Sequence, residues 1–140
     1  MNIDDCIRFA NENPVCHVAT AVDNQPYVRI LGMWFADKTG FYFQSGSIKE
    51  LPGQLAVNPK TELCFYHHEG ITGTMLRVQG EAEILDDQVF KNKVVEDRPF
   101  LKTLGLTAES PDLFLFRIAH GKAHFWTMAN NLKAKAYINF

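Results

Sequence analysis

The sequence has 140 residues, of which 46% are hydrophobic and 11 are Phe, and this composition is typical of a globular chain with a sizeable core. Its formal net charge of −2 provides no field that would attract nucleic acid or an anionic membrane, so we expect neither as a partner. The longest apolar runs, such as residues 113–116, are too short to span a bilayer. No repeat or linker interrupts the chain, and we interpret residues 1–140 as one domain.

Cysteine usage and the first residues bear on location. Cys6, Cys16 and Cys64 are odd in number and scattered, without a Cys-x-x-Cys motif, which favours free thiols in a reducing compartment. Residues 1–5 lack the basic start and the apolar core of a signal peptide. We therefore expect a cytoplasmic protein.

Periodicity and turn signals predict a chain of short strands interrupted by a few short helices. The predicted strands lie at residues 15–22, 27–36, 41–43, 61–67, 74–84, 114–119 and 122–127, the last two forming a hairpin about His120-Gly121. The predicted helices lie at residues 3–13, from Ser47 to the Asn58-Pro59 stop, and at residues 86–96. Six to seven largely antiparallel strands with short flanking helices predict a mainly β (β+α) fold that closes into a barrel.

The segment Gln44-Ser45-Gly46-Ser47-Ile48-Lys49 carries the first functional signal. A strand would end here and a helix begin, and the free N–H groups at a helix N-terminus suit a phosphate. Ser47 could donate its hydroxyl and Lys49 its charge, while Gly46 lets the backbone approach. Alternatively, Ser47 is only an N-cap, with Glu50 at capping-box spacing, and Lys49 is a solvated surface charge.

Arg29 supplies the second signal, because it lies in the middle of a strand on a face that otherwise looks buried. A buried guanidinium needs an anionic partner or several acceptors. That partner could be the carboxylate of Asp37 or Glu83, which would make the arginine structural. It could instead be a ligand phosphate, gripped by Arg29 together with Lys49 and the Ser47 turn.

These residues belong to an ordered set that resembles the flavin-binding core of the pyridoxamine 5′-phosphate oxidase-like family. The resemblance extends from roughly residue 3 to residue 127, and both the order of the pieces and the distances between them are similar to the family's pattern. The pieces are Pro26-Tyr27-Val28-Arg29-Ile30-Leu31, Phe41-Tyr42-Phe43-Gln44-Ser45-Gly46-Ser47-Ile48-Lys49, Leu55-Ala56-Val57-Asn58-Pro59 and Leu63-Cys64-Phe65-Tyr66.

The resemblance implies a split β-barrel that forms a homodimer and binds FMN at the subunit interface. By position, Arg29, Ser47 and Lys49 would hold the phosphate. The resemblance also places residues along the ring and the ribityl chain: Ile30, Leu31 and Gly32 through their backbone, and Gln44 and Ser45 at the polar edge or the ribityl chain. Candidates for contacts across the interface are Met75, Arg77 and Trp126, although a core role for the methionine and the tryptophan is the alternative.

The chain departs from the oxidase proper in two places. The oxidase closes with an Arg-x-His-Asp-Arg-like segment that grips its vitamin substrate, and the tail of this chain has no such segment. Ile48 stands where the oxidase has a second basic residue. We therefore do not expect oxidation of pyridoxamine phosphate.

Other reactive residues do not form a recognisable site. His67 and His68 adjoin on a predicted strand and so point to opposite faces, and we expect no metal site there or at the pair His120 and His124. Cys16 is interpreted as a buried structural thiol. No Walker loop, G-x-G-x-x-G fingerprint or Ser-His-Asp arrangement is present, and no catalytic residue is assigned.

The sequence thus predicts an FMN-dependent oxidoreductase in which the flavin carries the chemistry, acting on a small molecule or an electron-transfer partner. Two alternatives stay open. One is a non-enzymatic flavin-binding electron carrier or redox sensor. The other is a related barrel that binds a different cofactor, such as haem or a deazaflavin.

Overall fold

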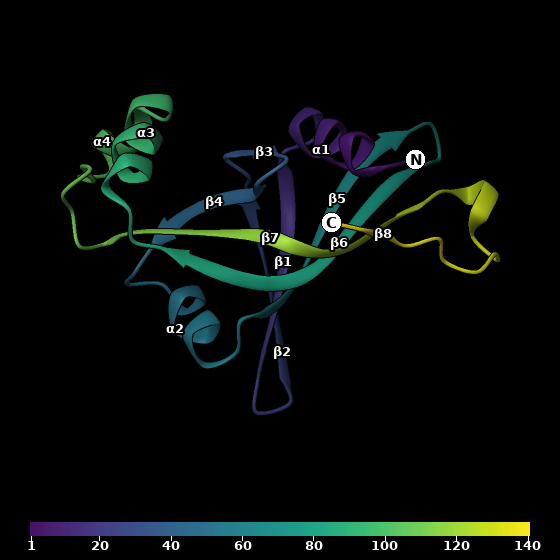
Figure 1. Cartoon of the computed structure of the whole chain (residues 1–140), viewed down its shortest axis with the longest axis horizontal. Coiled ribbons are helices and arrows are strands. Elements are labelled where there is room, and N and C mark those ends of the chain that lie inside the picture. Colours follow the sequence, from purple (N-terminus) through teal and green to yellow (C-terminus); the bar gives the residue numbers. More distant parts are fainter.

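The computed structural model describes all 140 residues and centres on one antiparallel sheet (Figure 1). Its strands are β1 (Val15–Val22), β2 (Gln25–Gly32), β3 (Phe35–Asp37), β4 (Gly40–Gly46), β5 (Lys60–Glu69), β6 (Thr72–Leu85), β7 (Leu113–Trp126) and β8 (Ile138–Asn139). The strand order is β2-β1-β5-β6-β7-β4-β3, and β8 pairs with β7. The predicted mainly β fold, a split barrel with short flanking helices, is confirmed, and the sheet has eight strands because two very short ones, β3 and β8, join it.

Short helices lie around the sheet rather than between its strands (Figure 1). They are α1 (Ile3–Glu12), α2 (Glu50–Val57), α3 (Gln88–Asp97), α4 (Phe100–Thr103) and the 3₁₀ helix η1 (Met128–Asn130). The predicted N-terminal helix is confirmed, and Asn2 and Asp5 form a capping box at its start. None of the helices is both long enough and apolar enough to cross a membrane.

The longest strands, β6 and β7, run side by side across the whole molecule (Figure 1). The predicted hairpin about His120-Gly121 is wrong, because β7 continues through this point without reversing. Gly121 instead lies opposite Gly80, where the pairing of β6 with β7 shifts register. A Cβ atom on Gly121 would lie 1.9 Å from the carbonyl oxygen of Gln79, so the glycine permits close approach of two strands rather than a turn.

Two predicted boundaries also move. The predicted strand over residues 27–36 is two strands, since β2 ends at Gly32 and β3 begins at Phe35. The helix predicted to start at Ser47 begins at Glu50 instead, with Lys49 at the N-cap position and no side-chain cap. The capping box of Ser47 and Glu50 is therefore not formed.

The core fills the inner face of the curved sheet and is closed by α1 and α2. Alternate residues of each strand point inward, so fully buried side chains such as Val18, Leu63 and Val78 meet in register across β1, β5 and β6. Phe41 and Phe43 of β4 also belong to this core. A second, smaller core beneath α3 and α4 comprises Val94, Val95, Leu101, Leu113 and Leu115.

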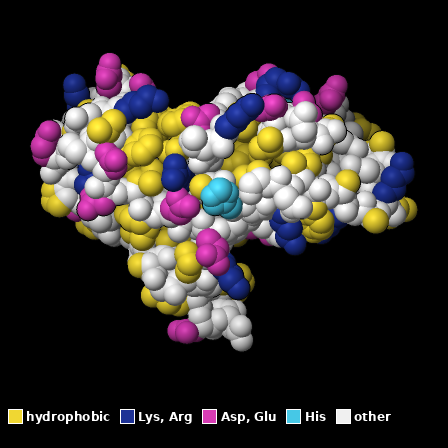
Figure 2. Space-filling model, viewed as in Figure 1, with side chains coloured by type: hydrophobic (Ala, Val, Ile, Leu, Met, Phe, Trp, Pro, Cys, Tyr) yellow, Lys and Arg dark blue, Asp and Glu magenta, His cyan; other side chains and the backbone are white.

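Charged side chains of both signs are scattered over the face shown in Figure 2, without a patch of one sign. This distribution agrees with the small net charge of the chain.

We expect Gly121→Ala to destabilise the fold, because the added methyl group must displace backbone at the crossing of β6 and β7. The expected loss in the free energy of unfolding is about 1–3 kcal/mol, as for other overpacking substitutions. Urea denaturation followed by circular dichroism measures it. Gly53→Ala is the control, since nothing lies within 4 Å of its added Cβ and alanine in a helix is favoured by about 0.5–1 kcal/mol. Equal stability of the two variants would contradict the role of Gly121 in allowing the close approach of β6 and β7.

Candidate functional site

Arg29 lies half-buried on the inner face of β2, paired in register with Val18 of β1. Its guanidinium donates hydrogen bonds to the Val18 carbonyl (3.3 Å), to Thr20 Oγ1 (2.8 Å) and to Gln54 Oε1 of α2. All three acceptors are neutral. Burial lowers the pKa of Arg29, and the negative charge of Glu50 only partly offsets this effect.

The two carboxylates that could have neutralised Arg29 have other partners. Asp37 accepts hydrogen bonds from Thr39 in its own turn, and Glu83 forms an ion pair with Arg117 at 2.8 Å. Arg29 therefore forms no ion pair within the chain, although a charged group taken out of water is stabilised most by an opposite charge.

Lys49 lies at the same cavity as Arg29. The cavity has a volume of about 240 Å³ and lies between β2 and the start of α2. Its lining residues are Arg29, Ile30, Leu31, Lys49, Glu50 and Leu51. Two cations and one carboxylate thus face a space large enough for a phosphate group, and the structure brings together the strand arginine and the lysine that the sequence predicted to cooperate.

Ser47 does not line this cavity. Its hydroxyl donates to Asp112 Oδ1 at 2.9 Å, and its backbone N–H donates to the Asp112 carbonyl, also at 2.9 Å. Asp112 precedes β7 in the chain and is 65 residues away in sequence. This partner could not be predicted from local pattern, and Ser47 would have to release it in order to bind a ligand.

The backbone of β2 offers a second set of polar groups. Because β2 is an edge strand of the sheet, the N–H and C=O groups along its outer edge have no strand partner. Ile30, Leu31 and Gly32, the residues predicted to present backbone to a ring, lie on this strand. Ile30 and Leu31 also line the cavity of Arg29 and Lys49.

Gln44 and Ser45 point to opposite faces of β4, since successive strand residues alternate. Gln44 Oε1 accepts a hydrogen bond of 2.5 Å from Arg98, which also donates to the carbonyls of Gly32 (3.2 Å) and Met33 (2.5 Å). The hydroxyl of Ser45 is buried and has no hydrogen-bond partner in the chain. Arg98 was not identified from the sequence, which shows it only as a polar residue before Pro99.

Met75, Arg77 and Trp126 lie on the outer face of the sheet, opposite to Arg29. Met75 pairs with Trp126 across β6 and β7, and Arg77 forms an ion pair with Glu62 of β5. Their strand neighbours are the buried core residues of the inner face. The sheet therefore separates the Arg29 side chain from these three side chains of the same chain.

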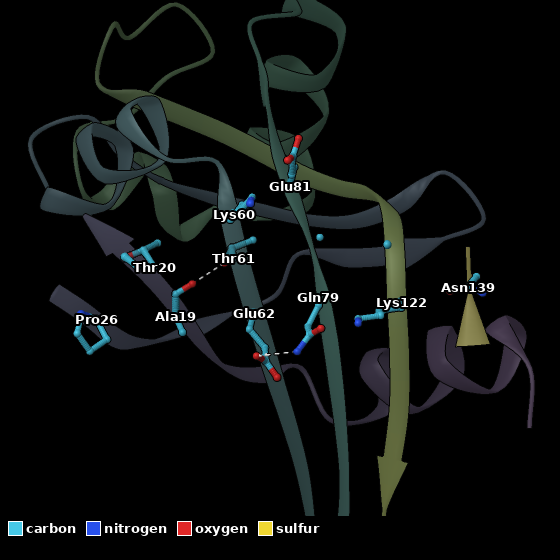
Figure 3. Close-up of a pocket in the computed structure, with 13 residues that line it drawn as sticks. Ala19, Thr20, Pro26, Lys60, Thr61, Glu62, Gln79, Glu81, Lys122 and Asn139 are labelled. Carbon is cyan, nitrogen blue, oxygen red and sulfur yellow. Dashed lines mark hydrogen bonds between the residues drawn. The ribbon is translucent and has the colours of Figure 1, made fainter. Parts of the chain in front are cut away.

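A broad trough crosses this outer face (Figure 3). Its volume is about 670 Å³. Glu62, Gln79 and Lys122 lie side by side in register on β5, β6 and β7, and Gln79 donates to Glu62 at 3.1 Å. The trough is larger than the cavity of Arg29 and Lys49, and its lining carries two lysines, Lys60 and Lys122, and two carboxylates, Glu62 and Glu81. Arg77 beside it is neutralised by Glu62. Its open shape suits a flat surface better than a small anion.

The remaining histidines and cysteines form no cluster of three or more metal-ligating side chains. His67 contacts Asn13, and the rings of His124 and Tyr137 meet edge to face with their centroids 5.4 Å apart. Burial lowers the pKa of His124. Cys16 is fully buried, and its thiol donates a weak hydrogen bond to the His17 carbonyl at 3.5 Å, so its interpretation as a structural thiol is supported.

The sequence matches one protein-family model. The model of the pyridoxamine 5′-phosphate oxidase family matches residues 3–127. The chain belongs to this family. The match confirms the predicted resemblance over most of the sequence. It includes every element that carries a predicted site residue, from β2 to β7.

Solved structures agree on the fold. A NimC/NimA family protein from Clostridium acetobutylicum superposes with a TM-score of 0.82 at 22% identity, covering 98% of this chain and 92% of that one. An FAD-binding protein from Mesorhizobium loti gives 0.69 at 23% identity, covering 89% and 94%. The haem storage protein HutZ from Vibrio cholerae gives 0.67 at 17% identity, covering 91% and 95%. No curated protein matches the sequence.

We expect Arg29→Met to leave the stability of the isolated protein unchanged or slightly higher, within about 1 kcal/mol, because it removes a half-buried charge that has only neutral partners. Thr20 and Gln54 keep their mutual hydrogen bond of 2.7 Å. Urea denaturation of the two proteins measures the difference. Arg117→Met is the comparison, since it removes a cation with a carboxylate partner and should lose about 1 kcal/mol. A larger loss for Arg29→Met would show that the arginine is structural.

Proposed function

We propose that this chain binds FMN and acts as an oxidoreductase of the pyridoxamine 5′-phosphate oxidase-like family, distinct from the vitamin B6 oxidase itself. One observation carries the proposal. The guanidinium of Arg29 has no carboxylate partner and shares a cavity with the ammonium group of Lys49. Two cations at one cavity, one of them half-buried, form an environment that favours a dianionic phosphate.

The chain's own residues would then divide the binding between them. Arg29 would donate to phosphate oxygens from the strand, and Lys49 would supply charge from the N-cap of α2, where free backbone N–H groups add partial positive charge. Glu50 at the same cavity opposes an anion. Ser47 would join only by exchanging its bond to Asp112, so we assign the main phosphate contacts to Arg29 and Lys49.

The ring would lie along the open edge of β2, where the backbone of Ile30, Leu31 and Gly32 faces no other strand. Gln44 is the polar side chain near the end of this edge, since Arg98 donates both to it and to the Gly32 carbonyl. Ser45 lies on the other face of β4, and its buried hydroxyl has no hydrogen-bond partner in the chain. A buried hydroxyl without a partner costs about 1–3 kcal/mol, and the polar part of a ligand would relieve that cost.

A bound flavin supplies the transfer of hydride or electrons, and the protein orients it and shields it from water. No acid or base of this chain is assigned to the reaction, and the substrate is a small molecule or an electron-transfer partner of unknown identity. An electron carrier or redox sensor would use the same site. The three free cysteines agree with a cytoplasmic location.

The absorption spectrum of the purified protein, with the mass of the group released on denaturation, tests the cofactor directly. A flavin spectrum and the mass of FMN would support the proposal. A Soret band would indicate haem, as the name of HutZ suggests for that relative, and the mass of a deazaflavin would indicate the third cofactor class.

We further propose that the functional unit is a homodimer with flavin at the subunit interface. Exposed apolar side chains on the outer face of the sheet, among them Val28 and Ile30 of β2 and Tyr66 of β5, are available for such an interface. Met75 and Trp126, also on that face, could complete the site only of the partner subunit, since the sheet separates them from Arg29 in their own.

Replacing either phosphate-binding cation should weaken FMN binding but not riboflavin binding. We expect Arg29→Ala and Lys49→Ala each to cost about 1–3 kcal/mol of FMN affinity, because a charge-assisted hydrogen bond is lost. Riboflavin lacks the phosphate and should bind the variants as it binds the wild-type protein. Isothermal titration of both ligands measures the difference.

The control is Arg8→Ala, which removes an exposed arginine that pairs with Asp5 on α1. It should change neither affinity. If both site variants kept wild-type preference for FMN over riboflavin, the phosphate site would have to lie elsewhere.

Subunit mixing tests the interface. We expect homodimers of Arg29→Ala and homodimers of Trp126→Ala each to bind FMN weakly, because every site in them lacks one contact. A purified heterodimer of the two variants would regain one intact site, since both defects fall in the other site. Fluorescence titration of FMN counts the sites. A heterodimer without any tight site would show that Trp126 does not act across the interface.

A further inference from the structure

The C-terminal end of α3 is hydrogen-bonded to the end of β2 and to the two residues that follow it. Arg98, the C-cap residue of α3, donates to the carbonyls of Gly32 and Met33 at 3.2 and 2.5 Å. Asp97 beside it accepts a hydrogen bond of 3.0 Å from the indole of Trp34. Residues 32–34, at the end of β2 and just after it, are thus hydrogen-bonded to residues 97–98, more than 60 positions further along the chain.

Arg98 connects this segment to β4 as well. Its guanidinium donates to Gln44 Oε1 at 2.5 Å, so one side chain bridges the end of β2 and the middle of β4. The planar guanidinium carries several N–H donors in a fixed arrangement, and three acceptors at fixed positions restrict it more than a single ion pair would.

The acceptors of Arg98 are all neutral, as they are for Arg29. The neighbouring carboxylate of Asp97 is engaged by Trp34 and forms no ion pair with Arg98. Burial lowers the pKa of Arg98, with a smaller opposing effect of Asp97. The chain therefore keeps two half-buried guanidinium groups without counter-ions, one on the inner face of β2 and one at the strand's end.

We propose that Arg98 is a positioning residue of the flavin site, which fixes the end of β2 and Gln44 and places a positive charge beside the ring. This inference rests on the proposed function, because Gly32 and Gln44 are the residues to which that function assigns ring contacts. A reduced flavin carries more negative charge than an oxidised one, so a nearby guanidinium binds the reduced form more tightly and raises the midpoint potential.

Arg117 provides a matched comparison within the same sheet. It also donates to two side chains, Glu83 at 2.8 Å and Tyr42 at 2.9 Å. Its charge is neutralised by the carboxylate, and it contacts neither β2 nor Gln44. Removing Arg117 therefore perturbs packing on β4 and β7 without removing a charge from the ring.

The experiment measures the two-electron midpoint potential of bound FMN by spectroelectrochemistry in wild type, Arg98→Met, Arg98→Lys and Arg117→Met. For Arg98→Met we expect the affinity for reduced relative to oxidised FMN to fall about tenfold, which lowers the potential by about 30 mV. Arg98→Lys keeps the charge but cannot bridge three acceptors, so it should retain most of the potential and lose affinity for both redox forms. Arg117→Met should leave the potential unchanged.

The outcomes distinguish failure of the role of Arg98 from failure of the proposed function. Wild-type potential and affinity in both Arg98 variants, with FMN bound, would overturn this inference and leave the proposed function intact. A wild-type protein that binds no flavin would overturn both. If Arg98→Met failed to fold, the lysine variant would still decide, because unchanged affinity for both redox forms in Arg98→Lys would exclude a positioning role.

Discussion

The half-buried guanidinium of Arg29 is the constraint around which the candidate site is organised. Antiparallel pairing of β2 with β1 fixes this side chain on the inner face, where it is half-buried. The Val18 carbonyl, Thr20 and Gln54 satisfy its N–H groups but leave its charge without a counter-ion. Because isolated charges are costly away from water, an anionic ligand gains more here than at an exposed arginine. Lys49 at the same cavity adds to that effect.

Strand β2 connects the cavity of Arg29 and Lys49 to the rest of the candidate site. It lies at the edge of the sheet and is held at two points, by Gln54 of α2 near its middle and by Arg98, the C-cap residue of α3, at its end. The flanking helices α2 and α3 thus both contact β2. They contact an edge strand that has a neighbouring strand on one side only.

The alternation of strand residues is also the physical reason for proposing a homodimer. Arg29 shares the inner face with the core, whereas Met75, Arg77 and Trp126 point away from it. Arg77 is held against Glu62 on that outer face. A site that used both sets would need a second copy of the chain, and the open trough on the outer face has a form that agrees with such a contact.

The sequence by itself determined the mainly β fold, most of the strands and the inward face of β2, because alternation and turn residues act over a few positions of the chain. The ordered set of segments that includes Arg29 and Lys49 also indicated the family. Tertiary structure decided the rest. It bound Ser47 to Asp112 and Gln44 to Arg98, 65 and 54 residues away, and it made Gly121 a point of strand crossing rather than a turn. Such partners are brought together only when distant strands pair, and no local pattern encodes them.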